Sequence, residues 1–294
     1  MINVRRLGHA TFTTPNLAEQ VDYYTRIIGL SLVHQDSKRA VLASRVGQEA
    51  IVLEQGDVSF MPRLAFQVAP GTELADMRRD LQAHGIASEI RTGITPGIDA
   101  ALTFHDPKGT LLEIFSDYRF APRDESMQGI MPFKIGHVAY RVTDVHEVVK
   151  FYTEVLGFRV SDWRGDFFTF LRCNPDHHAV NFVYDAKPQI HHIAFELKDW
   201  GEIHRGCETL ACNGIPLVWG PGRHIIGHNI ACYHRNTDNL RVELYTEMDQ
   251  MKDEALGYFE PRPWHQDRPQ RPKTWGPETL RNYWGVGSER NIHL

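Results

Sequence analysis

The sequence predicts an α+β fold in which four βαβββ units form two tandem homologous modules, the second of which encloses a metal-binding cleft. The first observation is an internal repeat: Leu7-Gly-His-Ala returns as Ile135-Gly-His-Val, and Leu112-Glu-Ile-Phe returns as Val242-Glu-Leu-Tyr, at a nearly constant separation. The second observation is that strand-like and helix-like segments alternate in the same order in both halves. The third is that histidines cluster in the second half, where they can serve as metal ligands.

Each module begins with a strand of alternating small and β-branched residues, at 7–13 and 135–142. A capping box predicts that a helix follows, because its two side chains satisfy backbone N–H groups at the helix start. The two boxes are Asn16 with Glu19 and Asp144 with Glu147. Further strands are expected at 40–44, 50–54 and 64–68 and at 167–171, 179–184 and 191–197, a second helix at 72–84 and 199–213, and a final strand at 111–116 and 240–246.

These elements divide the chain into three regions. Residues 1–120 form an N-terminal module, residues 133–246 a C-terminal module, and residues 247–294 an arm rich in proline and aromatic residues. Prolines favour an extended path, and the tryptophans of the arm need a surface to cover. We expect the segment from Tyr258 to Trp275 to lie over the mouth of the C-terminal cleft. The alternative is that the arm packs on a neighbouring subunit.

Composition restricts the classes of function. With 42% hydrophobic and 23% charged residues, the chain is predicted to be an ordinary globular protein. A net charge of -5 argues against a nucleic-acid partner, which usually demands a basic face. No apolar run approaches the ~20 residues that a membrane span needs. The cysteines form no CxxC pair and are expected to be reduced thiols, which predicts a cytoplasmic protein.

Three residues of the C-terminal module have the chemistry of metal ligands. His137 lies in the first strand of the module, His192 in a middle strand and Glu243 in the last strand. Because side chains alternate faces along a strand, these three can converge inside a curved sheet. Two imidazoles and one carboxylate form the facial-triad set of non-haem Fe(II), and the set also suits Mn(II). The neighbouring His191 is predicted to point to the opposite face of its strand.

The repeat supplies a control for this metal site. The matching positions in the N-terminal module are His9, Arg63 and Glu113. Because an arginine replaces one ligand, the N-terminal module is predicted to bind no metal. A set that is complete in one module and interrupted in the other favours a metal site over the alternative of ordinary core or surface residues.

Further motifs lie between the ligands. Ile135-Gly-His-Val-Ala, Ile190-His-His-Ile-Ala-Phe and Arg241-Val-Glu-Leu-Tyr carry the ligands, and Asp176-His-His, Gly220-Pro-Gly-Arg-His and Cys232-Tyr lie between them. This run resembles type I extradiol ring-cleaving dioxygenases of the vicinal oxygen chelate, or glyoxalase-bleomycin resistance, superfamily. The resemblance implies that His178 is an acid/base group and that His224 and Tyr233 hydrogen-bond the ring oxygen on the cleavage side. His228 and His234 are interpreted as neighbours only.

The N-terminal module lacks this second set of groups as well. Its matching positions are Glu49 or a residue nearby, Ile94 and Thr103. Phenylalanines on the strands of the C-terminal module are more often core than pocket, although they can line an apolar pocket. They are Phe167, Phe168, Phe170 and Phe182.

The resemblance implies a dioxygenase that inserts both atoms of O2 into a catechol or substituted catechol to give a semialdehyde acid, in aromatic compound degradation. Its cofactor would be Fe(II), with Mn(II) as the second metal that suits the ligands. Its partners would be a catecholic small molecule and O2, and the chain would form a homo-oligomer, a dimer or tetramer. Two alternatives stay open: a 4-hydroxyphenylpyruvate-dioxygenase-like oxygenase, which would not use His178, His224 and Tyr233, and a non-enzymatic binding protein of the same superfamily.

Overall fold

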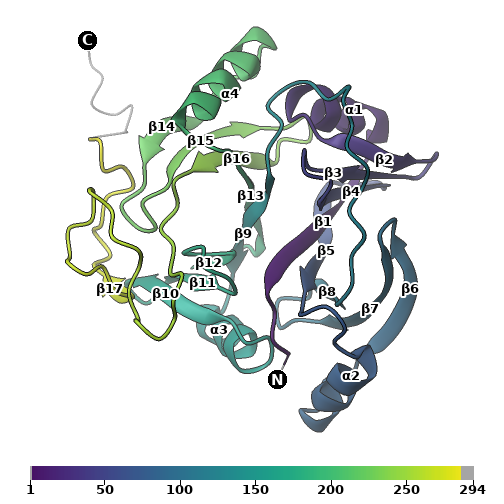
Figure 1. Ribbon diagram of the computed structural model, residues 1–294, viewed down its shortest axis with the longest axis horizontal. Coiled ribbons are helices and arrows are strands. Elements are labelled where there is room, and N and C mark those ends of the chain that lie inside the picture. Colours follow the sequence, from purple (N-terminus) through teal and green to yellow (C-terminus); the bar gives the residue numbers. More distant parts are fainter. Residues whose placement is uncertain (1, 286–294) are drawn as a thin grey trace.

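Two curled sheets, each flanked by helices, carry the fold in a computed structural model that describes residues 2–285 (Figure 1). The N-terminal module contains, in chain order, β1 (Arg6–Thr14), α1 (Leu17–Asp22), the π-helical turn η1 (Tyr23–Ile27), β2 (Ser31–Gln35), β3 (Arg39–Ala43), β4 (Glu49–Gln55), β5 (Phe60–Gln67), α2 (Leu74–Ala83), β6 (Glu89–Thr95), β7 (Ile98–His105) and β8 (Leu111–Phe115). The C-terminal module contains β9 (Lys134–Val142), α3 (Val145–Glu154), β10 (Arg159–Arg164), β11 (Phe168–Arg172), β12 (Val180–Tyr184), β13 (Gln189–Glu196), α4 (Trp200–Cys212), β14 (Trp219–Arg223), β15 (Ile230–Arg235) and β16 (Arg241–Thr246), and the arm adds β17 (Lys273–Trp275).

The two sheets repeat one topology, which confirms the predicted fold class of four βαβββ units. The strand order is β2-β3-β4-β1-β5-β8-β7-β6 in the first sheet and β14-β15-β16-β13-β9-β12-β11-β10-β17 in the second. In both, the first strand of the module lies at the centre, parallel to the last strand of its own unit and antiparallel to the first strand of the next unit. The three strands β9, β13 and β16 are therefore neighbours, although they lie far apart in the sequence.

Only one of the two predicted capping boxes has its N-cap hydrogen bond. At α3, the Asp144 side chain accepts a hydrogen bond from the backbone N–H of Glu147 at 2.9 Å, as predicted. At α1, the side chain of Asn16 makes no such bond, so the predicted cap is wrong there. The backbone N–H of Asn16 instead donates to the Thr14 hydroxyl at 3.1 Å, and α1 passes into the π-helical turn after six residues.

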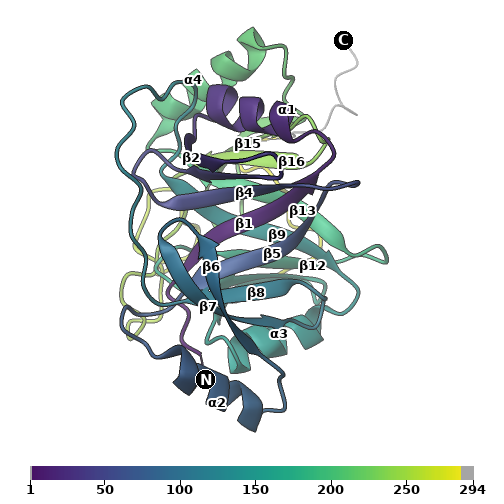
Figure 2. The same ribbon diagram turned by 90° about the vertical axis from the view of Figure 1, so that its right-hand side faces the viewer.

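One apolar core includes residues of both modules. The central strands β1 and β9 of the two modules lie side by side (Figure 2). Polar contacts join the modules as well: the Tyr23 hydroxyl lies 2.7 Å from Nε2 of His234, and the Tyr152 hydroxyl donates to Asp106 at 3.0 Å. All four side chains are buried, so removing one partner would leave a polar group without a partner in the core. His234 thus belongs to the junction of the modules.

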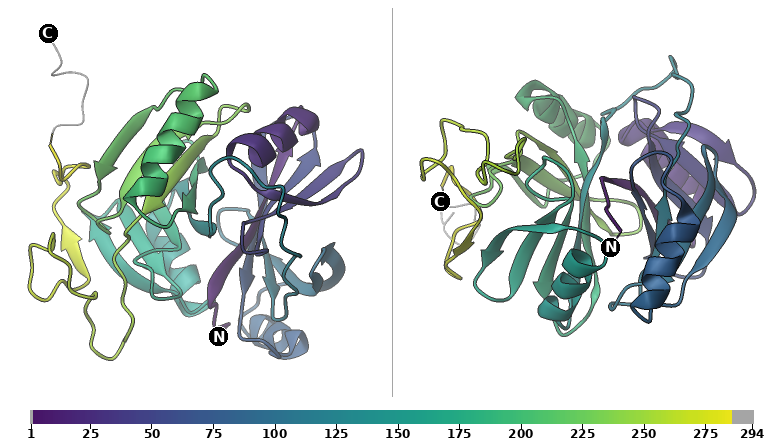
Figure 3. Two further views of the ribbon diagram at one scale, coloured as in Figure 1. Left: turned by 45° about the horizontal axis from the view of Figure 1, so that its top comes forward. Right: turned by 60° about the horizontal axis from the view of Figure 1, so that its bottom comes forward.

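The arm lies against the C-terminal module and away from the N-terminal module (Figure 3). Its strand β17 pairs parallel with β10 and becomes the edge of the second sheet. Trp275 packs against Phe170 and Ile226, and Phe259 is buried beside the ring of His177 at 5.0 Å. These contacts are made within one chain. Between residues 2 and 285, no helix is both long enough and apolar enough to cross a membrane.

Candidate metal centre and active site

The three predicted ligands meet at one point on adjacent strands. His137 lies on β9, His192 on β13 and Glu243 on β16. The two Nε2 atoms are 3.1 Å apart, and each lies 3.0 Å from the same carboxylate oxygen, Oε2 of Glu243. All three residues are buried, with at most 5% of their surface exposed. The pairing of β13 with β9 and with β16 brings these three side chains into contact.

The electrostatics of this group suit a divalent cation. Burial would raise the pKa of Glu243, but the imidazoles of His137 and His192 hold it well below its usual range. Burial lowers the pKa of His192 to about 4, although Glu243 opposes this shift. The carboxylate is therefore ionised and the His192 imidazole neutral at physiological pH, which are the forms that metals bind.

The spacing also fits an ion. Two ligand atoms that are about 2.1 Å from an ion and at right angles lie about 3.0 Å apart, the separation expected for the facial set of an octahedral site. The three ligand atoms show this separation pairwise. The outer carboxylate oxygen Oε1 of Glu243 accepts from the Asn229 amide at 3.0 Å, which fixes the plane of the carboxylate.

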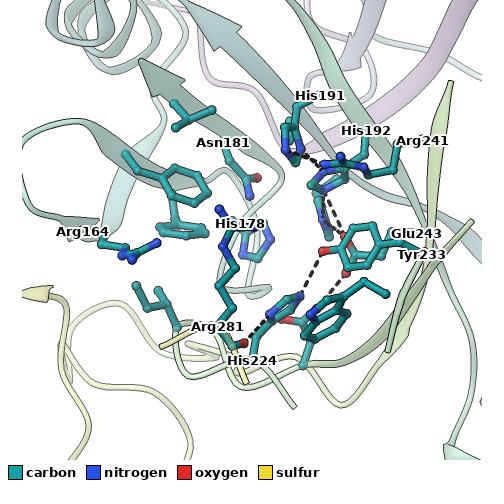
Figure 4. A pocket seen from close by; sticks show the side chains of 18 of the residues that line it. Arg164, His178, Asn181, His191, His192, His224, Tyr233, Arg241, Glu243 and Arg281 are labelled. Atoms are coloured by element: carbon teal, nitrogen blue, oxygen red, sulfur yellow. Dashed lines mark hydrogen bonds and ion pairs between the residues drawn. The ribbon is translucent and has the colours of Figure 1, made fainter. Parts of the chain in front are cut away.

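The three other predicted active-site residues surround the same point (Figure 4). The ring of His178 lies 4.3 Å from the ring of His137, between centroids. Nε2 of His224 lies 3.0 Å from the Tyr233 hydroxyl, and the ring of Tyr233 lies 5.3 Å from that of His192. The structure thus brings all six predicted site residues to one cavity.

These surrounding groups are held in neutral forms by their environment. Burial, together with the neighbouring rings of His137 and His177, lowers the pKa of His178 well below its usual value. Burial also lowers the pKa of His224, and burial together with the Glu243 carboxylate raises the pKa of Tyr233 well above its usual value. Neutral imidazoles can accept a proton and a neutral phenol can donate one, so the site offers both to a bound ligand.

His191 does not point away from the site, which corrects the prediction made from strand alternation. A bulge interrupts the pairing of β13 with β9 between Ile190 and His192. Because a bulge inserts an extra residue, both histidines turn toward the cavity. Nδ1 of His191 lies 2.6 Å from Nδ1 of His192, and Arg241 donates to Nε2 of His191 at 2.7 Å. His191 therefore contacts His192 and joins it to Arg241.

A cavity of about 450 Å³ opens beside the metal ligands. Phe167, Phe168 and Phe170 line it, whereas Phe182 is buried in the core against Tyr140 and Tyr152. Three of the four phenylalanines therefore line the pocket, and the fourth belongs to the core.

The arm reaches this cavity through a segment other than the predicted one. Thr279, Leu280 and Arg281 line the cavity, and the backbone carbonyl of Arg281 lies 3.0 Å from Nδ1 of His224. The predicted segment from Tyr258 to Trp275 contributes no residue to the lining of the cavity. Its strand β17 pairs with β10, and its Phe259 packs against His177. The correction follows from the pairing of β17 with β10, which holds the earlier part of the arm at the sheet edge.

The matching site of the N-terminal module holds an internal ion pair. Nε2 of His9 lies 2.9 Å from Oε2 of Glu113, and Nε of Arg63 lies 3.3 Å from the other carboxylate oxygen. The guanidinium of Arg63 thus takes the place of the third ligand and supplies the positive charge itself. The residues at the other matching positions serve the fold: Glu49 pairs with Arg6, Ile94 lies in an apolar cluster, and the Thr103 hydroxyl donates to a backbone carbonyl.

Sequence reasoning did not find three groups that the structure places around the site. Asn229 holds Glu243, and the pair of Asp162 and His177 lies behind His178. Another buried cluster joins the arm to the module: Asp249 accepts from His228 at 2.6 Å and from His265 at 2.8 Å. The one signal for these groups in the sequence was the pair of adjacent histidines, His177 and His178. The sequence does not show which carboxylate lies against such a pair.

Comparison with known proteins agrees with this geometry. Residues 134–244 match the model of the Glyoxalase/Bleomycin resistance protein/Dioxygenase superfamily. The chain is 26% identical to a biphenyl-2,3-diol 1,2-dioxygenase of Paraburkholderia xenovorans over 96% of this chain and 97% of that protein. It is 22% identical to an iron-dependent extradiol dioxygenase of Rhodococcus jostii, over 86% of this chain and 93% of that protein.

A solved structure shares the fold over nearly the whole chain. The Mn(II)-bound glyoxalase from Novosphingobium aromaticivorans superposes with a TM-score of 0.81 at 26% identity, covering 98% of this chain and 93% of that one. The likeness extends across both modules and the arm. The C-terminal module of this chain is therefore similar to the glyoxalase/bleomycin resistance protein/dioxygenase superfamily over residues 134–244.

Proposed function

We propose that the chain is an extradiol ring-cleaving dioxygenase, which inserts both atoms of O2 into a catechol or substituted catechol to give a semialdehyde acid. The observation that carries this proposal is the arrangement of six residues around one cavity. A facial set of His137, His192 and Glu243 faces the same space as His178, His224 and Tyr233. The named activities of the two relatives support the same reaction class.

The cofactor is Fe(II) or Mn(II), held by the two imidazoles and the carboxylate. The relatives include an iron-dependent enzyme and a protein with bound Mn(II), and the ligand types suit both ions. When bound, such an ion lowers the pKa of a ligated hydroxyl and offers adjacent positions to the catechol and O2.

The protein groups around the ion orient the catechol and handle its protons. On the β14–β15 side of the cavity, Nδ1–H of His224 donates to the carbonyl of Arg281, and the Tyr233 hydroxyl donates to Nε2 of His224. A bound catechol oxygen would take over the Tyr233 hydroxyl as its donor. His178 lies on the opposite side, with its neutral ring beside His137. A catechol bound between them loses a hydroxyl proton to an imidazole on one side and keeps a hydrogen bond to its ring oxygen on the other. Such acid/base groups typically contribute about 10²–10⁴-fold to rate.

The mouth of the cavity favours a substrate that has both apolar and anionic parts. Phe167, Phe168 and Leu280 give apolar surface, whereas Arg164 and Arg281 bring guanidinium groups to the same rim. Burial and the charge of Arg281 lower the pKa of Arg164, while the nearby carboxylate of Glu278 raises it, so part of the repulsion between the two cations remains. An acidic substituent on the catechol would relieve this repulsion.

The experiment is to load the protein anaerobically with Fe(II) or Mn(II) and to add a panel of catechols. The panel pairs neutral substituents with carboxylate substituents of similar length. Ring cleavage gives a yellow product with uptake of one O2 per catechol, and we expect the lower KM for the carboxylate members. If no catechol is cleaved while the metal is bound in one equivalent, the proposal is contradicted and the non-enzymatic binding protein is favoured. Turnover of a keto acid without dependence on His178 would favour the 4-hydroxyphenylpyruvate-dioxygenase-like alternative.

We also propose that the protein is cytoplasmic and forms a homo-oligomer. Free thiols at all four cysteines support a reducing compartment. Light scattering of the metal-loaded protein measures the oligomeric state, and a monomer at micromolar concentration contradicts the second part of this proposal.

A further inference from the structure

We propose that Asp162 and His177 are positioning residues that set the tautomer of His178, and through it the direction of the first proton transfer. The inference rests on the proposed function, because it concerns the acid/base group of that reaction. Nδ1 of His178 lies 2.9 Å from Nδ1 of His177, and Nε2 of His177 lies 2.9 Å from Oδ2 of Asp162. The chain of contacts is buried throughout, with exposed fractions of 3%, 0% and 2% from His178 to Asp162.

The positions of the protons follow from the donor and acceptor capacity of each group. An ionised carboxylate only accepts, so the N–H of His177 that faces Asp162 is on Nε2. A neutral His177 then presents a lone pair on Nδ1, and this lone pair requires a donor on the facing ring. The donor is Nδ1–H of His178. Because a neutral imidazole has one N–H, Nε2 of His178 is left with a lone pair, on a ring that lines the cavity and whose Nδ1 is occupied by His177.

This tautomer gives His178 a defined role at the start of the reaction. Nε2 accepts a proton from a catechol hydroxyl and can return it at a later stage. The opposite tautomer would place an N–H at the cavity, where it could not accept that proton. Asp162 therefore acts on the substrate through two intervening rings, and it is a positioning residue because it does not touch the reacting atoms.

The surroundings hold these two residues in place. The second carboxylate oxygen of Asp162 accepts from the backbone N–H of Lys273 at 2.7 Å, so the arm strand β17 fixes the carboxylate. The backbone N–H of His177 donates to the carbonyl of Asp249 at 2.8 Å. A Cβ at Gly227 would come within 3.1 Å of Nδ1 of His177, which shows how closely the neighbouring loop packs on the ring. The ring of Phe259 covers it from the arm side.

The competing interpretation is that Asp162 and His177 only attach the arm. The cluster of His228, Asp249 and His265 provides the comparison, because it makes the same kind of buried contact between the arm and the module. Its histidine side chains make no hydrogen bond to His178 among the described residues. Asp162→Asn and Asp249→Asn therefore each weaken a buried carboxylate–histidine contact at the arm, and only the first lies in the chain to His178.

Asp162→Asn should reverse the tautomers. An Asn whose carbonyl still accepts from Lys273 turns its NH2 group toward Nε2 of His177, which must then accept. The His177 proton moves to Nδ1, and the proton of His178 must move to Nε2. We expect kcat to fall by about 10²-fold, the contribution of a lost proton acceptor, while KM changes by less than about threefold because the cavity is unchanged. Asp162→Glu should recover a large part of kcat.

A readout that does not depend on turnover is the ¹⁵N spectrum of histidine side chains in the full chain loaded with diamagnetic Zn²⁺. His178→Asn and His177→Gln identify the two rings in the spectrum. We expect Nδ1–H on His178 and Nε2–H on His177 in the wild type, with both reversed in Asp162→Asn and neither changed in Asp249→Asn. His177→Gln, which removes the relay, also tests kcat if Asp162→Asn does not fold.

Three results would overturn the inference: a wild-type His178 protonated on Nε2, a doubly protonated His177, or equal losses of kcat in Asp162→Asn and Asp249→Asn with unchanged tautomers. The failure of the proposed function looks different. In that case no catechol is turned over by the wild type, while the tautomers of His178 and His177 remain measurable.

Discussion

The two modules have the same strand framework, but they compensate the charge of a buried carboxylate in different ways. In the C-terminal module, two imidazoles converge on one oxygen of Glu243, in a group that could hold a cation. In the N-terminal module, Arg63 enters the same place and pairs with Glu113 directly. A buried carboxylate needs a positive partner in either case. From this difference we expect Arg63 to decide whether that partner is part of the chain or comes from solution.

The modules differ in a second way that the metal ligands alone do not explain. Around the C-terminal site, His178, His224 and Tyr233 line an open cavity that the arm borders. Around the N-terminal site, Glu49 pairs with Arg6 and Ile94 belongs to an apolar cluster. The N-terminal module thus supplies packing surface for its partner, and the shared core joins them.

The largest effect that this comparison predicts is the loss of metal from one module only. Glu243→Ala removes the carboxylate from the group of His137, His192 and Glu243, so we expect the metal content after dialysis to fall to near zero and catechol cleavage to be abolished. Glu113→Ala is the matched control, and it should retain one metal ion per chain. Elemental analysis measures both. Full metal content in Glu243→Ala, or loss of metal from Glu113→Ala, would contradict the comparison.

The next effect tests the groups around the metal. His178→Asn should keep the metal and the KM for catechol but lower kcat by about 10²–10⁴-fold, the usual range for a lost acid/base group. Glu49→Gln, at or near the matching position of the N-terminal module, is the control and should leave kcat unchanged. Steady-state kinetics with metal analysis of each variant measures the split. A loss of turnover below about threefold would assign His178 a purely structural role.

A smaller effect tests the arm, which borders one module and not the other. Deleting residues 276–294 keeps β17 but removes Thr279, Leu280 and Arg281 from the cavity. We expect KM to rise about tenfold, which corresponds to about 1.4 kcal/mol of binding free energy, with the metal and the oligomeric state unchanged. Kinetics and light scattering check these outcomes. Dissociation of the oligomer would show that this segment holds subunits together instead.

The smallest expected effect comes from the reverse change, in which the N-terminal module gains a third ligand. Arg63→His restores the third ligand type in the N-terminal module, so a second equivalent of Mn(II) should bind when the ion is in excess. Its affinity should be weaker than that of the C-terminal site, where the Asn229 amide orients the carboxylate. EPR titration counts the bound ions, and kcat should not increase. Saturation at one ion even in excess would show that the strand geometry, and not Arg63 alone, excludes the metal.

The sequence predicted which strands carry the candidate ligands wherever strand position was sufficient. His137 and Glu243 follow from alternation on strands at matched positions of a repeat, and His192 follows from its alignment with Arg63. Alternation failed at His191, since the bulge in β13 depends on pairing with β9 and leaves no mark in the local pattern. The predicted cap at Asn16 failed for a similar reason, because Thr14 and the π-helical turn take over that helix start.

By itself, the sequence predicted the repeat, five of the eight strands in each module, and which module has two histidines and a glutamate at the matched positions. It did not locate β2, β6 and β7 in the first module or β10, β14 and β15 in the second. The properties that it predicted depend on the periodicity of side chains and on residue identity, and both can be read along the chain. Only the tertiary structure decided which distant groups meet. The placement of Asp162 behind His177, the turn of His191 into the cavity and the arrival of Thr279–Arg281 at its mouth depend on strand pairing and on the path of the arm. Such contacts join residues whose local sequence patterns are independent, and packing of the whole chain selects them.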